Sequence, residues 1–172
     1  MHDATNEITA WFRGRLPDEW TAEAPASITV DREEITIVLT LAAPDVGDVD
    51  DAARAEAVDG RIQRFRDETR DRRIEIARVA EHRFERKVSW GVTIGDRTAL
   101  FTHLAAPAMT RLRQPERLVL DTLIAAGVAR SRADALAWCV RLVGEHTDDW
   151  LSRLRDALDD VERIRAEGPD AA

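Results

Sequence analysis

The chain has 172 residues, a formal net charge of −8 at pH 7, and a composition that is 44% hydrophobic and 34% charged. A chain of this length can bury one or two small cores, so one or two domains are expected. The acidic balance disfavours nonspecific coating of nucleic acid, because phosphate binding depends on surplus lysine and arginine.

Cysteine usage and hydropathy constrain the compartment. The single cysteine, Cys139, excludes an intramolecular disulfide and a cysteine-based zinc site. The N-terminus has no apolar run typical of a signal peptide, and no stretch is long enough to cross a bilayer. We therefore expect a cytoplasmic protein with no membrane partner.

Residues 1–106 predict a small N-terminal α+β domain with the element order α-β-β-α-β-β. Period-two alternation and β-branched residues indicate the strands, as in ITIVLTL, and DREE and Gly95-Asp96 suit hairpin turns. In chain order, the expected elements are a helix at Asn6–Leu16, a hairpin within Ser27–Leu41, a long helix at about Asp51–Phe84, and strands at Lys87–Ile94 and Thr98–Leu104.

The middle of the long helix, RDETRDRR (residues 66–73), is almost wholly polar. We expect the helix to kink, break or project from the domain there. Such a run could also form a ridge that binds nucleic acid. Because its acids and bases interleave and can pair at i,i+4 spacing, we interpret it as a solvated face.

Residues 107–146 begin with a short extended run and continue as two helices. Ala108–Arg113 predicts one strand, Pro115 suits the first turn of a helix, and Gly127 suits its end. Ser131 is the expected N-cap of a second helix that runs through Val143. The expected apolar faces are Leu118, Val119, Leu120, Leu123 and Ile124 in the first helix, and Ala133, Leu136, Ala137, Val140 and Val143 in the second.

Residues 147–172 predict a C-terminal amphipathic helix and a disordered tail. Thr147 is the expected N-cap for a helix over about Asp148–Ala166, and the tail is EGPDAA. The apolar stripe of this helix consists of Trp150, Leu151, Leu154, Leu158, Val161 and Ile164.

The segment 107–146 is expected to require a second copy of itself. A lone strand and two short helices cannot bury their apolar faces, and the strand would leave its backbone groups unpaired. Pairing with the same strand of a second copy gives a two-stranded antiparallel ribbon over four helices, so we expect an obligate homodimer. The segment is also basic, because Met109–Arg141 carries six arginines and three acidic residues, and its net charge of +3 leaves −11 on the remainder.

This order of elements resembles the ribbon-helix-helix superfamily of DNA-binding proteins, which includes MetJ, Arc and CopG. The resemblance rests on Leu112-Arg113-Gln114-Pro115 at the end of the strand and on the segment Ser131–Leu136, SRADAL. It implies that Met109, Arg111 and Arg113 face the DNA major groove, where arginine pairs well with guanine edges. It implies further that Thr110 and Leu112 face the core, and that Ser131 and Arg132 contact backbone phosphate.

Other candidate sites are weaker. The four histidines lack ligand spacing, and the aspartates between Asp45 and Asp51 lack the alternation of a calcium loop, so we expect no metal site. With no phosphate loop or nucleophile elbow, we expect no catalytic residue, no cofactor and no enzyme activity. Trp138 and Cys139 are interpreted as packing residues. Trp11, Trp20, Trp90 and Trp150 are interpreted as core anchors, with base stacking by Trp90 or Phe101 as an alternative.

Together these features predict a homodimeric protein that binds double-stranded DNA in a sequence-specific manner through a two-stranded ribbon, with transcriptional regulation as its expected role. The alternative keeps the fold without the DNA. In that case the ribbon-helix-helix segment only dimerises the chain, and the N-terminal domain binds a protein, or an RNA partner such as the ribosome.

Overall fold

The computed structural model describes residues 2–167, and the chain forms two compact units, one ending at Pro107 and one beginning at Ala108. Each unit is an independent cluster of packed elements with its own apolar core. Most of the tail that the sequence predicts to be disordered, residues 168–172, lies outside the described residues. The chain is a mixed α+β protein, as expected.

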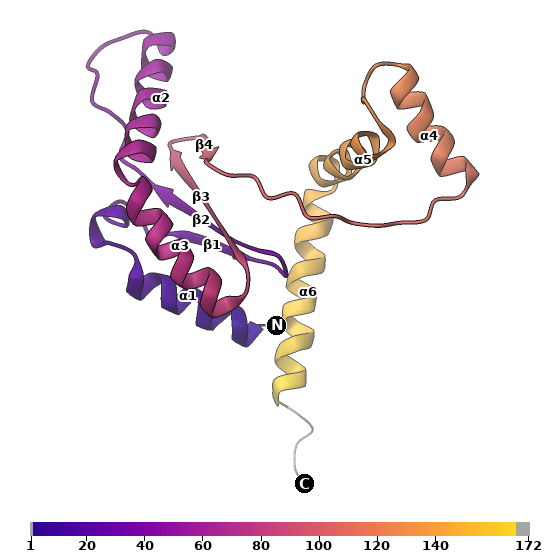
Figure 1. Ribbon diagram of the computed structural model, residues 1–172, viewed down its shortest axis with the longest axis horizontal. Helices are drawn as coiled ribbons and strands as arrows, with labels where there is room; N and C mark the ends of the chain where they lie inside the picture. The colour runs from indigo at the N-terminus through magenta and orange to yellow at the C-terminus, as the bar shows by residue number, and fades with distance from the viewer. Residues whose placement is uncertain (1, 168–172) are drawn as a thin grey trace. The chain divides into compact units, whose positions relative to one another are not determined.

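The first unit is built around a four-stranded sheet (Figure 1). The predicted strands are present, but the single long helix of the prediction is two helices. The elements are α1 (His2–Arg15), a short 3-10 helix (Asp18–Trp20), β1 (Ser27–Val30), β2 (Glu34–Thr40), α2 (Asp51–Glu68), α3 (Arg70–Phe84), β3 (Lys87–Ile94) and β4 (Arg97–Leu100).

The strands lie in the order β1-β2-β3-β4. The two outer pairs are antiparallel hairpins, whereas β2 and β3 at the centre are parallel, with Ile37 opposite Trp90. Parallel neighbours need a long crossover connection, and α2 and α3 together provide it. The β3–β4 hairpin turns at Gly95-Asp96 as expected, with Gly95 at a φ of 60°.

The helices cover one face of the sheet. Alternate residues of β2 are fully buried, which is the pattern that a strand with one covered face predicts. Aromatic rings fill the centre of this layer: Trp90 packs edge-to-face on Trp20 and on Phe12. The buried core consists mainly of Ile8 and Phe12 from α1, Leu16 directly after it, Ile62 and Phe65 from α2, Ile76 and Ala80 from α3, Ile35, Ile37 and Leu39 from β2, and Val88, Trp90, Val92 and Ile94 from β3.

The environments of Trp90 and Trp150 contradict two expectations, base stacking by Trp90 and a core position for Trp150. Trp90 is only 4% exposed, so it is unable to stack on a base. Its indole Nε1 is buried and has no hydrogen-bond partner among the described residues. Trp150, expected as a core anchor, is 57% exposed.

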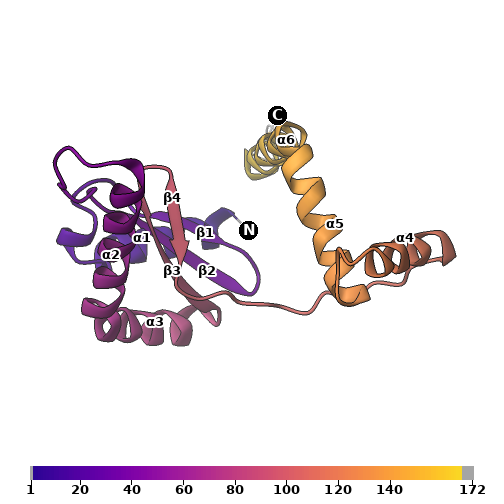
Figure 2. The same ribbon diagram turned by 90° about the horizontal axis from the view of Figure 1, so that it is seen from above.

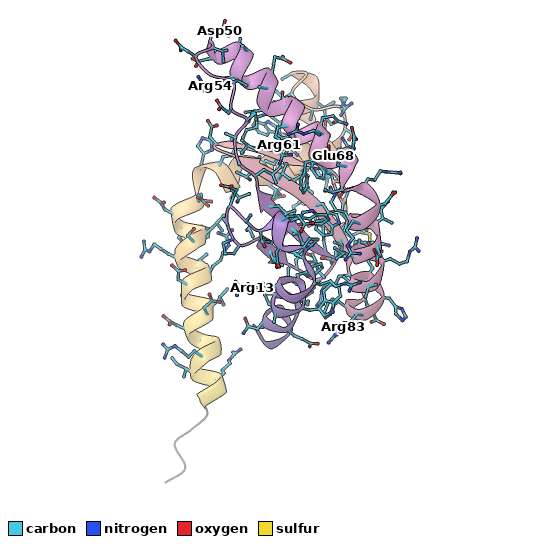
Figure 3. The ribbon with its side chains drawn as sticks, turned by 90° about the vertical axis from the view of Figure 1, so that its left-hand side faces the viewer. Arg13, Asp50, Arg54, Arg61, Glu68 and Arg83 are labelled. Carbon is cyan, nitrogen blue, oxygen red and sulfur yellow. The ribbon has the colours of Figure 1, made fainter. Side chains whose placement is uncertain are left out.

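The crossover breaks at Thr69, inside the polar run where the sequence predicted a kink or break. The Thr69 hydroxyl donates to the Phe65 carbonyl, and the Arg73 guanidinium donates to Thr69 Oγ1 at 3.0 Å and to the Arg66 carbonyl at 2.6 Å. Arg73 thereby satisfies a carbonyl that the interrupted helix leaves without its usual donor. Figure 3 shows the two helices in succession, with Asp50 where α2 begins and Arg83 near the end of α3.

The second unit is helical (Figure 2), and its core is much smaller than that of the first unit. Its helices are α4 (Gln114–Ala125), α5 (Arg132–His146) and α6 (Asp148–Glu167). Its buried residues are Leu120, Ala129 and Ala135, and Leu112, Leu123, Ile124, Leu136 and Cys139 pack partly buried around them. Within the part of the chain that the structure describes, no helix has the length and apolarity needed to traverse a lipid bilayer.

Gly91 of β3 marks a close approach of two backbones in the sheet. A Cβ atom there would lie 2.6 Å from Leu100 Cδ2 and 2.9 Å from the Ala99 carbonyl oxygen of β4. Because the carbonyl belongs to a paired backbone, it has no room to move aside. The glycine is therefore what allows β4 to pair with β3 at this position.

Gly91→Ala is expected to destabilise the first unit by about 1–3 kcal/mol, as overpacking of a filled core does. Urea-induced unfolding measured by the circular dichroism of the full chain checks this. Gly14→Ala is the matched control, because nothing lies within 4 Å of a Cβ at Gly14, which is inside α1. If both variants unfold at the wild-type midpoint, the close contact at Gly91 does not limit stability.

Candidate nucleic-acid interface

The predicted strand Ala108–Arg113 has no regular secondary structure in the single chain. The strand predicted at Thr98–Leu104 also ends early: the Phe101 N–H still donates to the Trp90 carbonyl at 2.7 Å, and residues 102–113 then connect the sheet to α4 without regular secondary structure. The segment is extended at its end, where Arg113 has φ −79° and ψ 174°. An extended segment whose ladder partner would come from another chain is compatible with these observations, and the ribbon stays a prediction.

One side chain and one carbonyl hold this segment against α4. Leu112 is half-buried and packs against the small core. The Leu112 carbonyl accepts a hydrogen bond from Arg117 Nη1 at 2.7 Å. Leu112 therefore faces inward as expected, whereas Thr110, expected to do the same, is exposed.

The three residues expected to face DNA are all exposed on this segment. Met109 is fully exposed, and Arg111 and Arg113 flank the half-buried Leu112 on both sides. Neither arginine forms an ion pair within the described part of the chain. The alternation that a strand of the ribbon would need is therefore present over residues 111–113.

The two residues expected to contact phosphate have structural roles. Ser131 is the N-cap of α5, with its hydroxyl accepting from the Asp134 backbone N–H at 3.2 Å. Arg132 donates from Nε and Nη2 to the two carboxylate oxygens of Asp121, at 2.7 Å each. The Arg132 fork therefore joins α5 to α4, and its charge is already neutralised.

Arg130 is an exposed cation that is not among the predicted DNA contacts. Its side chain is 96% exposed, and its Nε lies 3.7 Å from Asp134, a long and solvent-screened pair. Its backbone N–H donates to Asp134 Oδ2 at 3.0 Å, which fixes the turn ahead of α5. Its place directly before the predicted phosphate contact Ser131 was the signal that could have found it.

A groove of about 340 Å³ lies between the extended segment and the helices of the second unit. Most of its wall is apolar, with Leu120 and Leu136 at the base of the segment that carries Met109. Its full lining is Ala108, Met109, Thr110, Leu112, Arg117, Leu120, Arg132, Ala133 and Leu136.

The helices of the second unit also leave apolar faces uncovered. The small core takes Leu120, Leu123 and Ile124 from α4 and Ala135, Leu136 and Cys139 from α5, so it uses only part of the expected apolar faces. On α5, Ala133, Ala137, Val140 and Val143 form a helical stripe that is exposed in the single chain. The largest exposed apolar side chains are Leu118, Val119, Val140, Val143, Trp150, Leu154, Leu158, Val161 and Ile164.

The acidic loop before α2 does not gather into a metal site. Asp50 caps α2 by accepting from the Ala53 N–H at 2.7 Å, and Asp45 accepts from the Gly47 N–H at 3.2 Å. Among the residues that the structure describes, no group of three or more histidine, cysteine, aspartate or glutamate side chains could hold a metal ion.

The chain is thus a two-unit α+β protein, in which a four-stranded sheet unit precedes a helical unit with a basic extended segment and exposed apolar faces. Residues 6–100 match the family described as Rv1265-like protein, N-terminal domain, and residues 113–165 match the Mb1296 C-terminal domain. The chain belongs to this Rv1265-like family. The family descriptions name neither a ribbon-helix-helix fold nor a ligand.

Relatives that match nearly the whole chain occur in mycobacteria. The chain is 57% identical over 160 residues to a protein of Mycobacterium bovis named uncharacterized protein Mb1296, and equally to Mycobacterium tuberculosis proteins named uncharacterized protein MT1303 and uncharacterized protein Rv1265. Each match covers 93% of this chain and 69% of the relative. No solved structure matches the chain significantly.

Low pH is expected to weaken the contact between α4 and α5. The hydrogen bonds from Arg132 lower the pKa of Asp121, and the backbone hydrogen bond from Arg130 lowers the pKa of Asp134. A carboxylate with a lowered folded-state pKa stabilises the fold above its unfolded pKa of about 3.9, and this stability is lost as the pH falls through the lowered value. Thermal unfolding should therefore move to lower temperature as the pH falls below about 4.

Thermal melts of the full chain and of Asp121→Asn, followed by circular dichroism between pH 7 and pH 3, measure this effect. The variant should melt below the wild type at pH 7, and the difference should shrink as the pH falls. A constant difference across this range would show that the Asp121 carboxylate does not carry the effect.

Proposed function

We propose that this chain is a homodimeric DNA-binding protein that reads the major groove with a ribbon-helix-helix module formed by two copies. In this proposal the extended segments of the two copies pair as an antiparallel ribbon, and α4 and α5 of both copies form a shared core. The observation that carries it is the combination of a basic extended segment without a ladder partner and apolar helix faces without cover.

The hydrophobic effect supports dimerisation. A valine or leucine side chain gains about 1.5–3 kcal/mol when it is moved fully out of water. The residues Leu118, Val119, Val140 and Val143 are each more than half exposed and are present twice in a dimer. Their combined gain is comparable with the cost of association, which is about 4–15 kcal/mol. A second copy, which supplies the missing strand as well, is the partner that meets both needs.

Charge and geometry support DNA as the ligand of the ribbon. Arg111 and Arg113 are exposed on either side of the inward Leu112 and have no acidic partner in the described part of the chain. Arginine offers a planar fork that pairs with guanine O6 and N7, and a two-stranded ribbon fits the major groove. The net charge of −11 outside Met109–Arg141 would confine phosphate binding to the surface of the module.

The ion pair between Arg132 and Asp121 favours the alternative function, in which the module only dimerises the chain. Arg132, one of the two expected phosphate contacts, is held in a two-pronged pair with Asp121. If the module serves dimerisation alone, this pair is simply an interhelical clasp, and the first unit would bind a protein or RNA partner. The two proposals differ in whether the ribbon arginines create affinity for duplex DNA that depends on salt.

Val140→Glu is expected to convert the dimer to a monomer, because it places a charge in the apolar stripe of α5 at a residue that is 66% exposed in the single chain. Sedimentation velocity on the full chain measures the mass directly. Arg141→Ala, at an exposed position of the same helix, changes the net charge by the same one unit and should remain dimeric. A wild-type chain that sediments as a monomer at micromolar concentration would overturn the dimer.

Arg111→Ala with Arg113→Ala should weaken duplex binding by about 1–3 kcal/mol for each arginine that pairs with a base, and should lower the salt dependence of the affinity. Duplexes selected from fragmented genomic DNA supply the probe, and fluorescence anisotropy at several salt concentrations measures the binding. Arg153→Ala with Arg155→Ala removes the same charge from α6 and should leave the salt slope nearly unchanged. If the wild-type dimer selects no duplex at low salt, the alternative function is favoured.

A further inference from the structure

The first unit contains a groove of about 450 Å³ that no part of the proposed DNA-binding function uses. It lies along the break between α2 and α3 and reaches the residues that follow β4. Its lining is Gln63, Arg66, Asp67, Arg70, Arg73, Ile74, Phe101 and Thr102.

The arginines of this groove come from both sides of the helix break. Arg66 lies in the last turn of α2, and Arg70 and Arg73, three residues apart, lie in the first turn of α3. Arg73 is 7% exposed, and its guanidinium carbon lies 4.7 Å from the centre of the Phe101 ring, whereas that of Arg66 lies 5.7 Å away. The Phe101 ring therefore contacts two guanidinium groups, that of the buried Arg73 and that of the exposed Arg66.

These three arginines are not neutralised by the acidic residues around them. Within the described residues, Arg66, Arg70 and Arg73 form no ion pair, whereas Arg72 in the same run pairs with Glu75 at 2.9 Å. The one carboxylate of the groove, Asp67, accepts from Gln63 Nε2 at 3.0 Å through both oxygens. Among the described residues, the i,i+4 pairing expected from the interleaved sequence is therefore not found at these three arginines, and the Arg72–Glu75 pair has i,i+3 spacing. The groove carries a net charge of +2, from three arginines and one aspartate.

One nitrogen of the buried Arg73 guanidinium forms no hydrogen bond within the described residues. Arg73 uses Nε and Nη2 to bridge the helix break, and Nη1 has no hydrogen-bond partner among the described residues. Burial, and next the like charges of Arg66 and Arg70, lower the pKa of Arg73, with Asp67 opposing them. An anion in the groove would relieve this repulsion and accept from the free donor.

The shape of the groove favours a small ligand. Its volume falls within the range of pockets for small molecules, about 300–1,000 Å³. A duplex backbone contacts cations that extend outward, whereas here one of the three guanidinium groups is buried at the bottom. The neighbouring Thr102 and Gln63 add a hydroxyl and an amide for polar groups around the anion.

We propose that Arg66, Arg70 and Arg73 form a binding site for the phosphate groups of a small phosphorylated molecule in the groove between α2, α3 and the residues after β4. The site belongs to the first unit alone and is independent of whether the second unit binds DNA. Arginine forks bind two phosphate oxygens at once, so a diphosphate is expected to bind more tightly than inorganic phosphate.

Isothermal titration calorimetry of the full chain measures its affinity for inorganic phosphate, pyrophosphate and ADP. Comparison of the three affinities distinguishes a site for free phosphate from a site for a diphosphate or a nucleotide. Saturable binding of pyrophosphate is expected, and Arg70→Gln should weaken it roughly tenfold or more, as the removal of a charge-assisted hydrogen bond does. Arg72→Gln is the matched control, because it removes the same charge from the same helix but lies outside the groove lining, and it should retain wild-type affinity. Tighter binding of ADP than of pyrophosphate would assign a nucleotide.

Three outcomes overturn the proposal. The first is an absence of saturable binding by all three probes at millimolar concentration. The second is an equal fall in affinity in Arg70→Gln and Arg72→Gln, which would indicate general charge attraction. The third is binding of a short DNA duplex that depends on Arg70 in the Arg111→Ala, Arg113→Ala background while pyrophosphate does not compete, which would make the groove a nucleic-acid surface. Arg66→Gln, at an exposed position, gives an independent variant if Arg70→Gln fails to fold.

Discussion

The parallel pairing of β2 with β3 is the constraint on which the first unit depends. Antiparallel strands need only a tight turn, but a parallel pair requires the chain to return across the sheet. A straight helix from Asp51 to Phe84 would be about 50 Å long, roughly twice the length of the strands that it must connect. The break at Thr69 resolves this mismatch by letting α2 and α3 each lie against the sheet. The groove follows from the same geometry, since the break requires Arg73 as an internal donor and brings Arg66 and Arg70 beside it.

The second unit buries few apolar residues within the single chain. Leu120, Ala129 and Ala135 are buried among the residues that the structure describes there, whereas the first unit buries a layer of aliphatic and aromatic residues from its helices and strands alike. Interhelical contacts such as the clasp between Arg132 and Asp121 are exposed to solvent and contribute little by comparison with apolar burial. The apolar stripes of α5 and α6 are therefore exposed in the single chain, and the stripe of α5 is the surface that the proposed dimer would cover.

Much of the fold could be predicted because it is encoded locally. The β-branched run ITIVLTL located β2, Gly95-Asp96 located the last turn of the sheet, and Ser131 located the start of α5. Spacing alone does not specify which part of an apolar face is covered within one chain. Helical spacing showed that α5 has apolar residues at Ala133, Ala137 and Val140, which are exposed in the single chain, whereas α4 packs on Ala135 and Leu136. The interpretation of Trp150 as a core residue was wrong, because its side chain is 57% exposed. The pairing of Arg132 with Asp121 and the Arg73 bridge join residues through the tertiary fold, and charge spacing alone does not specify them.

The distribution of tryptophan gives the two units different optical properties. Trp20 and Trp90 are buried against each other in the first unit, with ring centres 6.0 Å apart, and the Trp90 indole N–H has no partner in the described chain. An indole in so apolar a setting emits at shorter wavelength than one in water. Trp150, by contrast, faces solvent on the apolar stripe of α6. Unfolding of the sheet core would therefore shift the emission maximum to longer wavelength, whereas burial of the α6 stripe would shift it to shorter wavelength. The direction of the shift thus distinguishes a change in the first unit from a change in the second.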